Sequence, residues 1–69
     1  MTKEYDLRIS LAAARVNAKL TQKEVANALN VSNKTICAWE NGTGEPSISQ
    51  AETLCDLYKR PMHSIIFLS

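Results

Sequence analysis

The sequence predicts an all-α domain, a compact bundle of five short helices, and three observations support this fold class. The chain has 69 residues, enough for one domain and close to the size where a single hydrophobic core is marginal. Its composition is 45% hydrophobic with only two glycines and two prolines, which is typical of a globular and mainly helical protein. Apolar residues also recur every three or four positions between residues that cap helices. We therefore expect a single domain over residues 1–69.

The first helix is expected over residues 6–18. Its alanines favour the helix and permit close packing against neighbouring elements. The apolar positions fall on one face, made of Leu7, Leu11, Ala14 and Ala18 and widened by Ile9, Ala13 and Val16.

Two further helices, over residues 21–30 and 32–41, are expected to form a pair joined by a tight turn. Thr21 and Glu24 have the T-x-x-E spacing of a capping box, in which each side chain accepts a hydrogen bond from the backbone of the other residue. Asn30 suits the turn because asparagine tolerates the left-handed conformation. Ser32 is the expected cap of the second helix, and a glycine, Gly42, ends it. The residues expected to pack this pair are Leu20, Val25, Ala26, Leu29, Val31, Ile36 and Trp39.

Residues 43–46 are expected to form a loop, since glycine and proline interrupt regular structure there. Ser47 and Gln50 have the spacing of another capping box and begin a fourth helix. That helix should end at Lys59-Arg60, because the residue before Pro61 is pushed out of the helical region. A fifth helix of one or two turns is expected over residues 62–68. The apolar stripe of the fourth helix is Ile48, Ala51, Leu54, Cys55 and Tyr58, and the fifth would add Ile65, Ile66 and Phe67.

The outer face of the 32–41 helix is the main indication of function. At about 100° per residue, Ile36 and Trp39 fall on one side, and polar or small residues fall on the other. A short helix that presents amide and ammonium groups outward suits the major groove of DNA, where such groups meet base edges. An ordinary solvated face on a small helical domain is the alternative interpretation. The outward residues are Asn33, Lys34, Cys37, Ala38 and Asn41.

Residues 20–42, LTQKEVANALNVSNKTICAWENG, resemble the helix-turn-helix of the lambda-repressor-like (Cro/repressor, xenobiotic-response-element type) transcriptional regulators. The similarity includes the apolar positions, the opening T-Q and the closing W-E-N-G. It extends upstream to A-A-R-V-N-A and downstream to P-S-I-S-Q and L-Y, so it covers nearly the whole chain. Lys19 departs from the family pattern, because relatives often carry a helix-ending glycine there, and Lys59 and Arg60 depart from a glycine and an apolar residue. The resemblance implies a bacterial or phage-encoded transcriptional regulator with its DNA-binding motif at about residues 21–41, located in the cytoplasm with the nucleoid.

On this hypothesis the base-reading residues are Ser32, Asn33, Lys34, Cys37 and Ala38. Asn33 can pair with adenine through two hydrogen bonds, Lys34 can donate to guanine, and the Ala38 methyl group suits a thymine methyl group. Gln22 begins the supporting helix, where side chain and backbone amides suit a phosphate. The expected phosphate contacts are therefore Thr21, Gln22, Lys23, Asn41 and Thr43.

In the resembled family, the positions of Arg15 and Glu40 commonly form an ion pair that links the first helix to the third. The resemblance implies the same structural pair here, and two unrelated surface side chains are the alternative. The expected partner is a double-stranded DNA operator, bound by two copies that associate weakly in solution and more strongly on DNA. The candidate dimer contacts are Ile65, Ile66, Phe67 and Leu68, although the first three can instead close the monomer core.

Several other functions find little support. The net charge is only +1, so DNA binding requires segregation of charge, and residues 1–44 hold six Lys and Arg against four Asp and Glu. His63 is the single histidine, and no nucleophile constellation or glycine-rich phosphate loop accompanies it, so no enzyme activity is expected.

The two cysteines and the hydropathy pattern bear on cofactors and compartment. Cys37 and Cys55 lack neighbours at metal-ligand spacing, so no metal or cofactor is expected, and both thiols should be reduced. One disulfide, and a redox-sensitive Cys37, are the alternatives for this pair. The sequence carries neither a signal peptide nor a membrane span, and it indicates no small-molecule effector. The remaining functional alternative is a protein-interaction or antitoxin-like module with the same helices.

Overall fold

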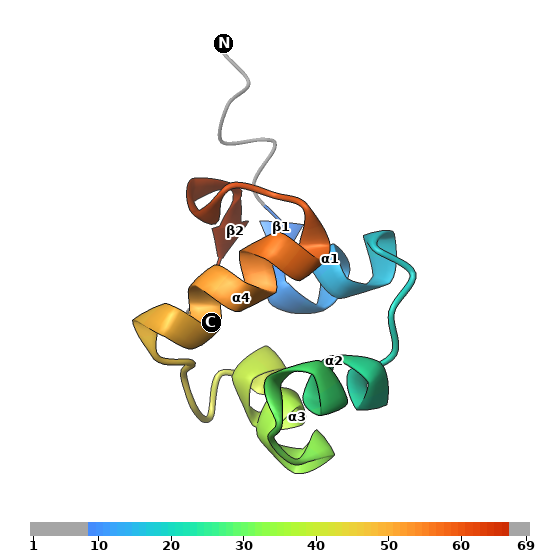
Figure 1. Ribbon diagram of the computed structural model, residues 1–69. Coiled ribbons are helices and arrows are strands. Elements are labelled where there is room, and N and C mark those ends of the chain that lie inside the picture. Colours follow the sequence, from blue (N-terminus) through green and yellow to red (C-terminus); the bar gives the residue numbers. More distant parts are fainter. Residues whose placement is uncertain (1–8, 67–69) are drawn as a thin grey trace, which may run out of the picture.

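The computed structural model describes residues 9–66. These residues form four α-helices, one short 3-10 helix and two short strands (Figure 1). The elements are, in chain order, β1 (Ile9–Ser10), α1 (Leu11–Asn17), α2 (Gln22–Leu29), α3 (Asn33–Asn41), α4 (Ile48–Tyr58), η2 (Met62–Ser64) and β2 (Ile65–Ile66).

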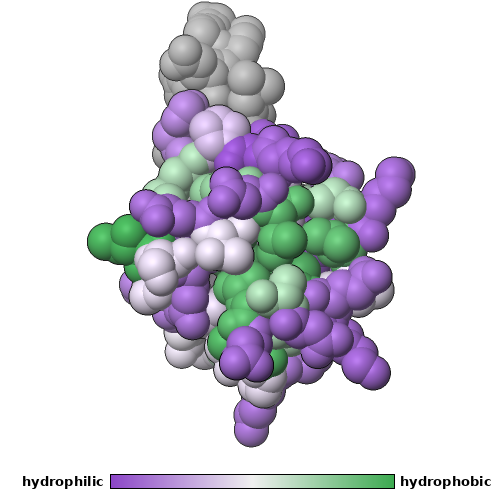
Figure 2. Space-filling view, viewed as in Figure 1, coloured by the Kyte–Doolittle hydropathy of each residue, from purple (hydrophilic) through white to green (hydrophobic). Residues whose placement is uncertain are grey.

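Helix α4 crosses the middle of the molecule, with α1 and the two strands on one side and the α2–α3 pair on the other (Figure 1). Every α-helix contributes at least one buried apolar side chain, so a single hydrophobic core joins them. In the view of Figure 2, hydrophilic residues project around the lower rim, which α2 and α3 occupy, and hydrophobic residues show mainly in the middle. The core consists of Leu11, Ala14, Val25, Ala26, Ile36, Trp39, Leu54, Tyr58 and Ile65.

The two ends of the described chain differ from the five-helix expectation. Helix α1 begins at Leu11 instead of starting before residue 9, and Ser10 caps it by accepting a hydrogen bond from the Ala13 N–H at 3.1 Å. The expected fifth helix is also wrong, because Met62–Ser64 form one 3-10 turn and Ile65–Ile66 form a strand. This strand pairs in parallel with Ile9–Ser10, so the two ends of the domain hold each other. The rest of the two expected helices, residues 6–8 and 67–68 with Leu7, Phe67 and Leu68, lies outside the described residues.

The α-helices end in the same backbone geometry, although only one of the four ends uses a glycine. Within two residues after each helix, one residue adopts a positive φ, and the next N–H donates to a carbonyl five residues back. Gly42 (φ 82°) and Asn30 (φ 59°) were expected to end α3 and α2, and both predictions are confirmed. Lys19 (φ 63°) and Lys59 (φ 58°) adopt the same conformation after α1 and α4, at positions where a side chain makes it less favourable.

Two residues expected in the core lie at the surface. Val16 is 60% exposed and Ile48 is 77% exposed. Val16 lies on the side of α1 away from Leu11 and Ala14. Ile48 is the first residue of α4, and it lies about 90° around the helix axis from the buried residues of that helix.

The local capping predictions were confirmed, because both capping boxes, Thr21 with Glu24 and Ser47 with Gln50, are formed. No helix within residues 9–66 has the length and apolar character to cross a membrane.

Candidate nucleic-acid interface

Buried side chains pack one face of α2 and one face of α3 into the core, and this packing determines which face of α3 points outward. Ile36 and Trp39 of α3 are 1% and 5% exposed and pack in the same core as Val25 of α2. The tight turn between the helices is closed by a hydrogen bond from the Val31 N–H to the Ala26 carbonyl at 3.0 Å. The opposite face of α3 is directed to solvent: Asn33 and Lys34 are exposed, and Cys37 and Ala38 are partly exposed.

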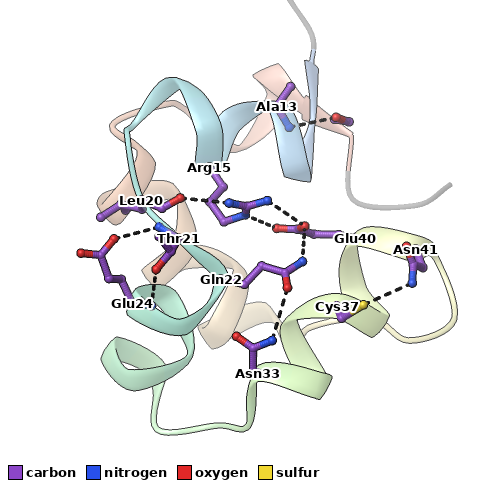
Figure 3. Close-up of polar contacts among 11 residues, drawn as sticks. Ala13, Arg15, Leu20, Thr21, Gln22, Glu24, Asn33, Cys37, Glu40 and Asn41 are labelled. Carbon is purple, nitrogen blue, oxygen red and sulfur yellow. Dashed lines mark hydrogen bonds and ion pairs between the residues drawn. The ribbon is translucent and has the colours of Figure 1, made fainter.

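Arg15 of α1 and Glu40 of α3 form an ion pair beneath this face (Figure 3). The Arg15 Nε donates to Glu40 Oε2 at 2.7 Å, and its Nη2 donates to Oε1 at 3.3 Å. The third guanidinium nitrogen, Nη1, donates to the Leu20 carbonyl at 3.0 Å, so Arg15 also holds the connection between α1 and α2. The side chains are 16% and 6% exposed, and the hydrogen bond to Glu40 raises the pKa of Arg15. The pair is charged and partly buried, and two hydrogen bonds join it, which makes it a rigid link between α1 and α3.

Two amide side chains continue this pair to the surface (Figure 3). Gln22 Nε2 donates to Glu40 Oε1 at 2.9 Å. Asn33 Nδ2, at the first position of α3, donates to Gln22 Oε1 at 3.3 Å. The residues Arg15, Glu40, Gln22 and Asn33 therefore form one hydrogen-bonded series, which we call the polar relay.

The ion pair determines the orientation of both amides in the polar relay. Glu40 is an ionised carboxylate and can only accept, so Gln22 must turn its NH2 group toward it and its carbonyl oxygen away. That oxygen in turn requires the NH2 group of Asn33. One N–H and the carbonyl oxygen of Asn33 are left for contacts outside the protein. This is the donor and acceptor pattern that matches the major-groove edge of adenine.

Several other expected contact residues are already engaged within the protein. The Ser32 hydroxyl accepts from the Thr35 N–H at 3.1 Å and lies 3.0 Å from the Thr35 hydroxyl. The Thr21 hydroxyl accepts from the Glu24 N–H at 3.0 Å. Both hydroxyls act as helix caps, so they are less available to DNA than their exposure indicates.

At the other end of α3, two side chains fold back onto the helix. Asn41 Nδ2 donates to the Cys37 sulfur at 3.4 Å, and the Thr43 hydroxyl donates to the Ala38 carbonyl at 3.3 Å. Lys23 and Lys34 are exposed, and no ion pair within residues 9–66 involves either of them. The only acidic side chain of α2, Glu24, is used in the capping box. The N-terminal ends of α2 and α3 therefore carry two exposed lysines, Lys23 and Lys34, against one carboxylate, Glu24.

Sequence reasoning placed Gln22 at a phosphate and missed its contacts with Glu40 and Asn33. No local signal reveals these contacts, because the residues of the polar relay lie far apart in the sequence. Tyr58 was expected in the apolar stripe of the fourth helix and is 4% exposed, but the sequence did not indicate that its buried hydroxyl has no hydrogen-bond partner within residues 9–66. Burial, together with the nearby Glu40 carboxylate, raises the pKa of Tyr58 to about 12. No cluster of His, Cys, Asp or Glu suited to a metal ion occurs in the described part of the chain.

Comparison with known proteins gives two matches. The family model described as "Helix-turn-helix" matches residues 11–65, which include the whole polar relay. The cryptic phage CTXphi transcriptional repressor RstR of Vibrio cholerae is 36% identical to this chain over 52 residues. The match covers 75% of this chain and 47% of the repressor, so this chain corresponds to about half of that protein. No solved structure matches.

Proposed function

The chain belongs to the helix-turn-helix family, and on this premise we propose that it binds double-stranded DNA at specific sites and regulates transcription. The similarity to a phage transcriptional repressor supports this function. The observation that carries the proposal is the polar relay, because it holds Asn33 at the start of α3 with a defined donor and acceptor facing outward. A helix that presents such a side chain at its N-terminal end is suited to reading base edges in the major groove.

Base recognition falls to the outer face of α3. Asn33 pairs with adenine, accepting from N6 and donating to N7. Lys34 is exposed and without an ion pair within residues 9–66, so its ammonium group is available to donate to guanine O6 and N7. Ala38 contacts a thymine methyl group, and Cys37 lies between them on the same face. Ser32 contributes mainly by capping the helix.

Phosphate binding falls to the ends of the two helices. At the start of α2 the capping box uses the N–H of Glu24, which leaves the N–H groups of Gln22 and Lys23 directed outward for a phosphate. The Lys23 ammonium group adds charge there, and Thr21 lies beside it. Asn41 and Thr43 lie at the far end of α3, where they can contact a phosphate across the groove.

Two copies are expected on one operator, with half-sites about 34 Å apart, because a single short recognition helix reads few base pairs. Association in free solution is weak in this proposal, and binding to a shared operator reinforces it. Ile65 is 5% exposed and belongs to the monomer core, so it is not free for the dimer contact expected of it. Ile66 lies in β2, and Phe67 and Leu68 lie outside the described residues.

The proposed function is tested by selecting bound sites from a random duplex pool and then titrating salt against binding to the selected site. We expect a defined two-half-site motif and a log–log salt slope near −0.9 for each neutralised phosphate. Binding to duplex DNA that is absent or independent of salt would contradict the proposal and favour a protein-interaction module. A regulator of this kind acts at the nucleoid, in the cytoplasm.

A further inference from the structure

One side of α4, together with the residue that follows it, carries four residues that lie away from the buried side chains of the helix, and of these only Cys55 also packs partly against the core. Ile48, Glu52 and Cys55 occur at intervals of four and three positions, which places them within about 60° on one side of the helix, and Lys59 follows as the residue that ends it. Ile48 is 77% exposed, Glu52 and Lys59 are exposed, and Cys55 is partly exposed. We call these four residues the α4 stripe.

The charges of the α4 stripe change sign along the helix. Glu52 lies near the middle and Lys59 at the C-terminal end, and within residues 9–66 neither side chain takes part in an ion pair. Two such helices in antiparallel orientation bring the carboxylate of each opposite the ammonium group of the other. A surface that is complementary to its own copy under a two-fold axis is the requirement for a symmetric dimer.

We propose that the α4 stripe is the contact between two copies of this chain, packed antiparallel about a two-fold axis that passes beside Cys55. In this register Glu52 of each copy faces Lys59 of the other, and the two Cys55 side chains lie next to the axis. Ile48 of one copy lies opposite the segment after Lys59 of the other, where Met62 is 41% exposed. The contact thus covers two of the three large exposed hydrophobic side chains of residues 9–66.

The dimer is weak, because one face of an 11-residue helix buries less than the roughly 1,200 Å² of a stable interface. Such weak association suits the proposed function, in which the shared operator brings the copies together. The contact leaves the recognition surface free, because Asn33 and Lys34 belong to α3. The inference rests on the proposed function only for its role on DNA, and it is tested without DNA.

The first experiment measures self-association of the full chain by sedimentation equilibrium over a concentration series. Glu52→Lys and Lys59→Glu should each weaken the dimer by about tenfold, because two ion pairs become two repulsive contacts. The double exchange, Glu52→Lys with Lys59→Glu, should restore the dimer. Glu45→Lys makes the same change of charge on an exposed loop residue outside the stripe and should have little effect.

The second experiment tests the position of the axis by oxidation with diamide at alkaline pH, since partial burial and the carboxylates of Asp56 and Glu52 raise the pKa of the Cys55 thiol. Two Cys55 thiols that meet at the axis form a disulfide, and their two electrons and two protons pass to diamide. The Cys37→Ser variant should give a covalent dimer, and the Cys55→Ser variant should not.

Three results would overturn the inference: a chain that stays monomeric at every concentration, a double exchange as weak as either single variant, or cross-linking that requires Cys37. Thermal unfolding of each variant shows whether it is folded, and all the exchanged side chains are exposed. Since no DNA is present, a failure here leaves the DNA-binding proposal intact, and a failure to select an operator leaves this contact intact.

Discussion

The polar relay and helix α4 differ in whether their polar side chains are hydrogen-bonded to one another. In the relay, Arg15 and Glu40 are partly buried, and they bond to each other, to Gln22 and to the Leu20 carbonyl. On α4, Glu52 is exposed and unpaired within residues 9–66, while the Tyr58 hydroxyl is buried without a partner there. Connected buried groups fix positions, because moving one leaves another unsatisfied. An isolated polar group does not hold a neighbouring side chain in place. The hydrogen bonds of the relay therefore connect α1 to the recognition surface, and the polar groups of α4 make no such connection.

The largest expected effect comes from breaking the ion pair. Arg15→Ala or Glu40→Ala leaves a partly buried charge without its partner and should lower the free energy of unfolding by about 2–4 kcal/mol. Chemical denaturation of both single variants and of the double variant measures the coupling between them. The double variant should lose much less than the sum of the two. Additive losses below about 0.5 kcal/mol would show that the relay has no structural importance.

The outer end of the relay should control base preference. Asn33→Ala or Lys34→Ala is expected to relax preference at one or two base pairs, at a cost of about 1–3 kcal/mol in binding free energy. Gln22→Ala should reduce preference at the same base pair as Asn33→Ala, because it frees the Asn33 amide to rotate.

Lys23→Ala is the matched control for Gln22→Ala, since Lys23 is the next residue of α2 and is outside the relay. It should weaken binding to all sequences about equally. Site selection and binding assays on both variants measure the difference. A Gln22→Ala protein that behaves like Lys23→Ala, losing affinity evenly with its motif unchanged, would remove Gln22 from base recognition.

Tyr58 tests the opposite case, a buried polar group without a partner. Its folded pKa of about 12 lies above the ordinary value of 10. The neutral phenol therefore contributes stability below pH 10, and this contribution is lost as the pH rises from 10 toward 12. The loss should reach roughly 1–3 kcal/mol.

Tyr58→Phe should flatten this alkaline dependence in thermal or chemical unfolding. At neutral pH it should cost little or even stabilise the fold, because the removed hydroxyl is unsatisfied within residues 9–66. A loss of more than about 2 kcal/mol at pH 7 would mean that the hydroxyl has a partner in the folded protein.

The smallest expected effect concerns the two lysines with positive φ. Lys19→Gly and Lys59→Gly should each stabilise the protein by about 0.5–1 kcal/mol, because glycine adopts this conformation without steric strain. Lys23→Gly, inside helix α2, is the control and should destabilise by a similar amount. Thermal unfolding measures all three, and a destabilising Lys59→Gly would show that the lysine side chain makes a compensating contact.

Local sequence alone predicted helices α2, α3 and α4 and the residues that begin or end them, whereas it placed the start of α1 too early. Capping boxes, the left-handed Asn30 and the end of α3 at Gly42 involve residues within one turn of each other. Such features were predictable because the interacting groups are neighbours along the chain. The outward face of α3 was also predictable, because helical periodicity separates Ile36 and Trp39 from Asn33 and Lys34.

The strands and the orientation of the recognition surface depend on contacts between residues far apart in the chain. Ile9–Ser10 and Ile65–Ile66 pair across almost the whole domain, and nothing local to either segment indicates a parallel partner. The surface position of Ile48 depends on where the core ends, which an apolar stripe alone cannot reveal. The Asn33 amide has its orientation because Glu40, held by Arg15 from another helix, can only accept hydrogen bonds. Local chemistry thus formed the recognition helix, and contacts between distant residues determined what it presents.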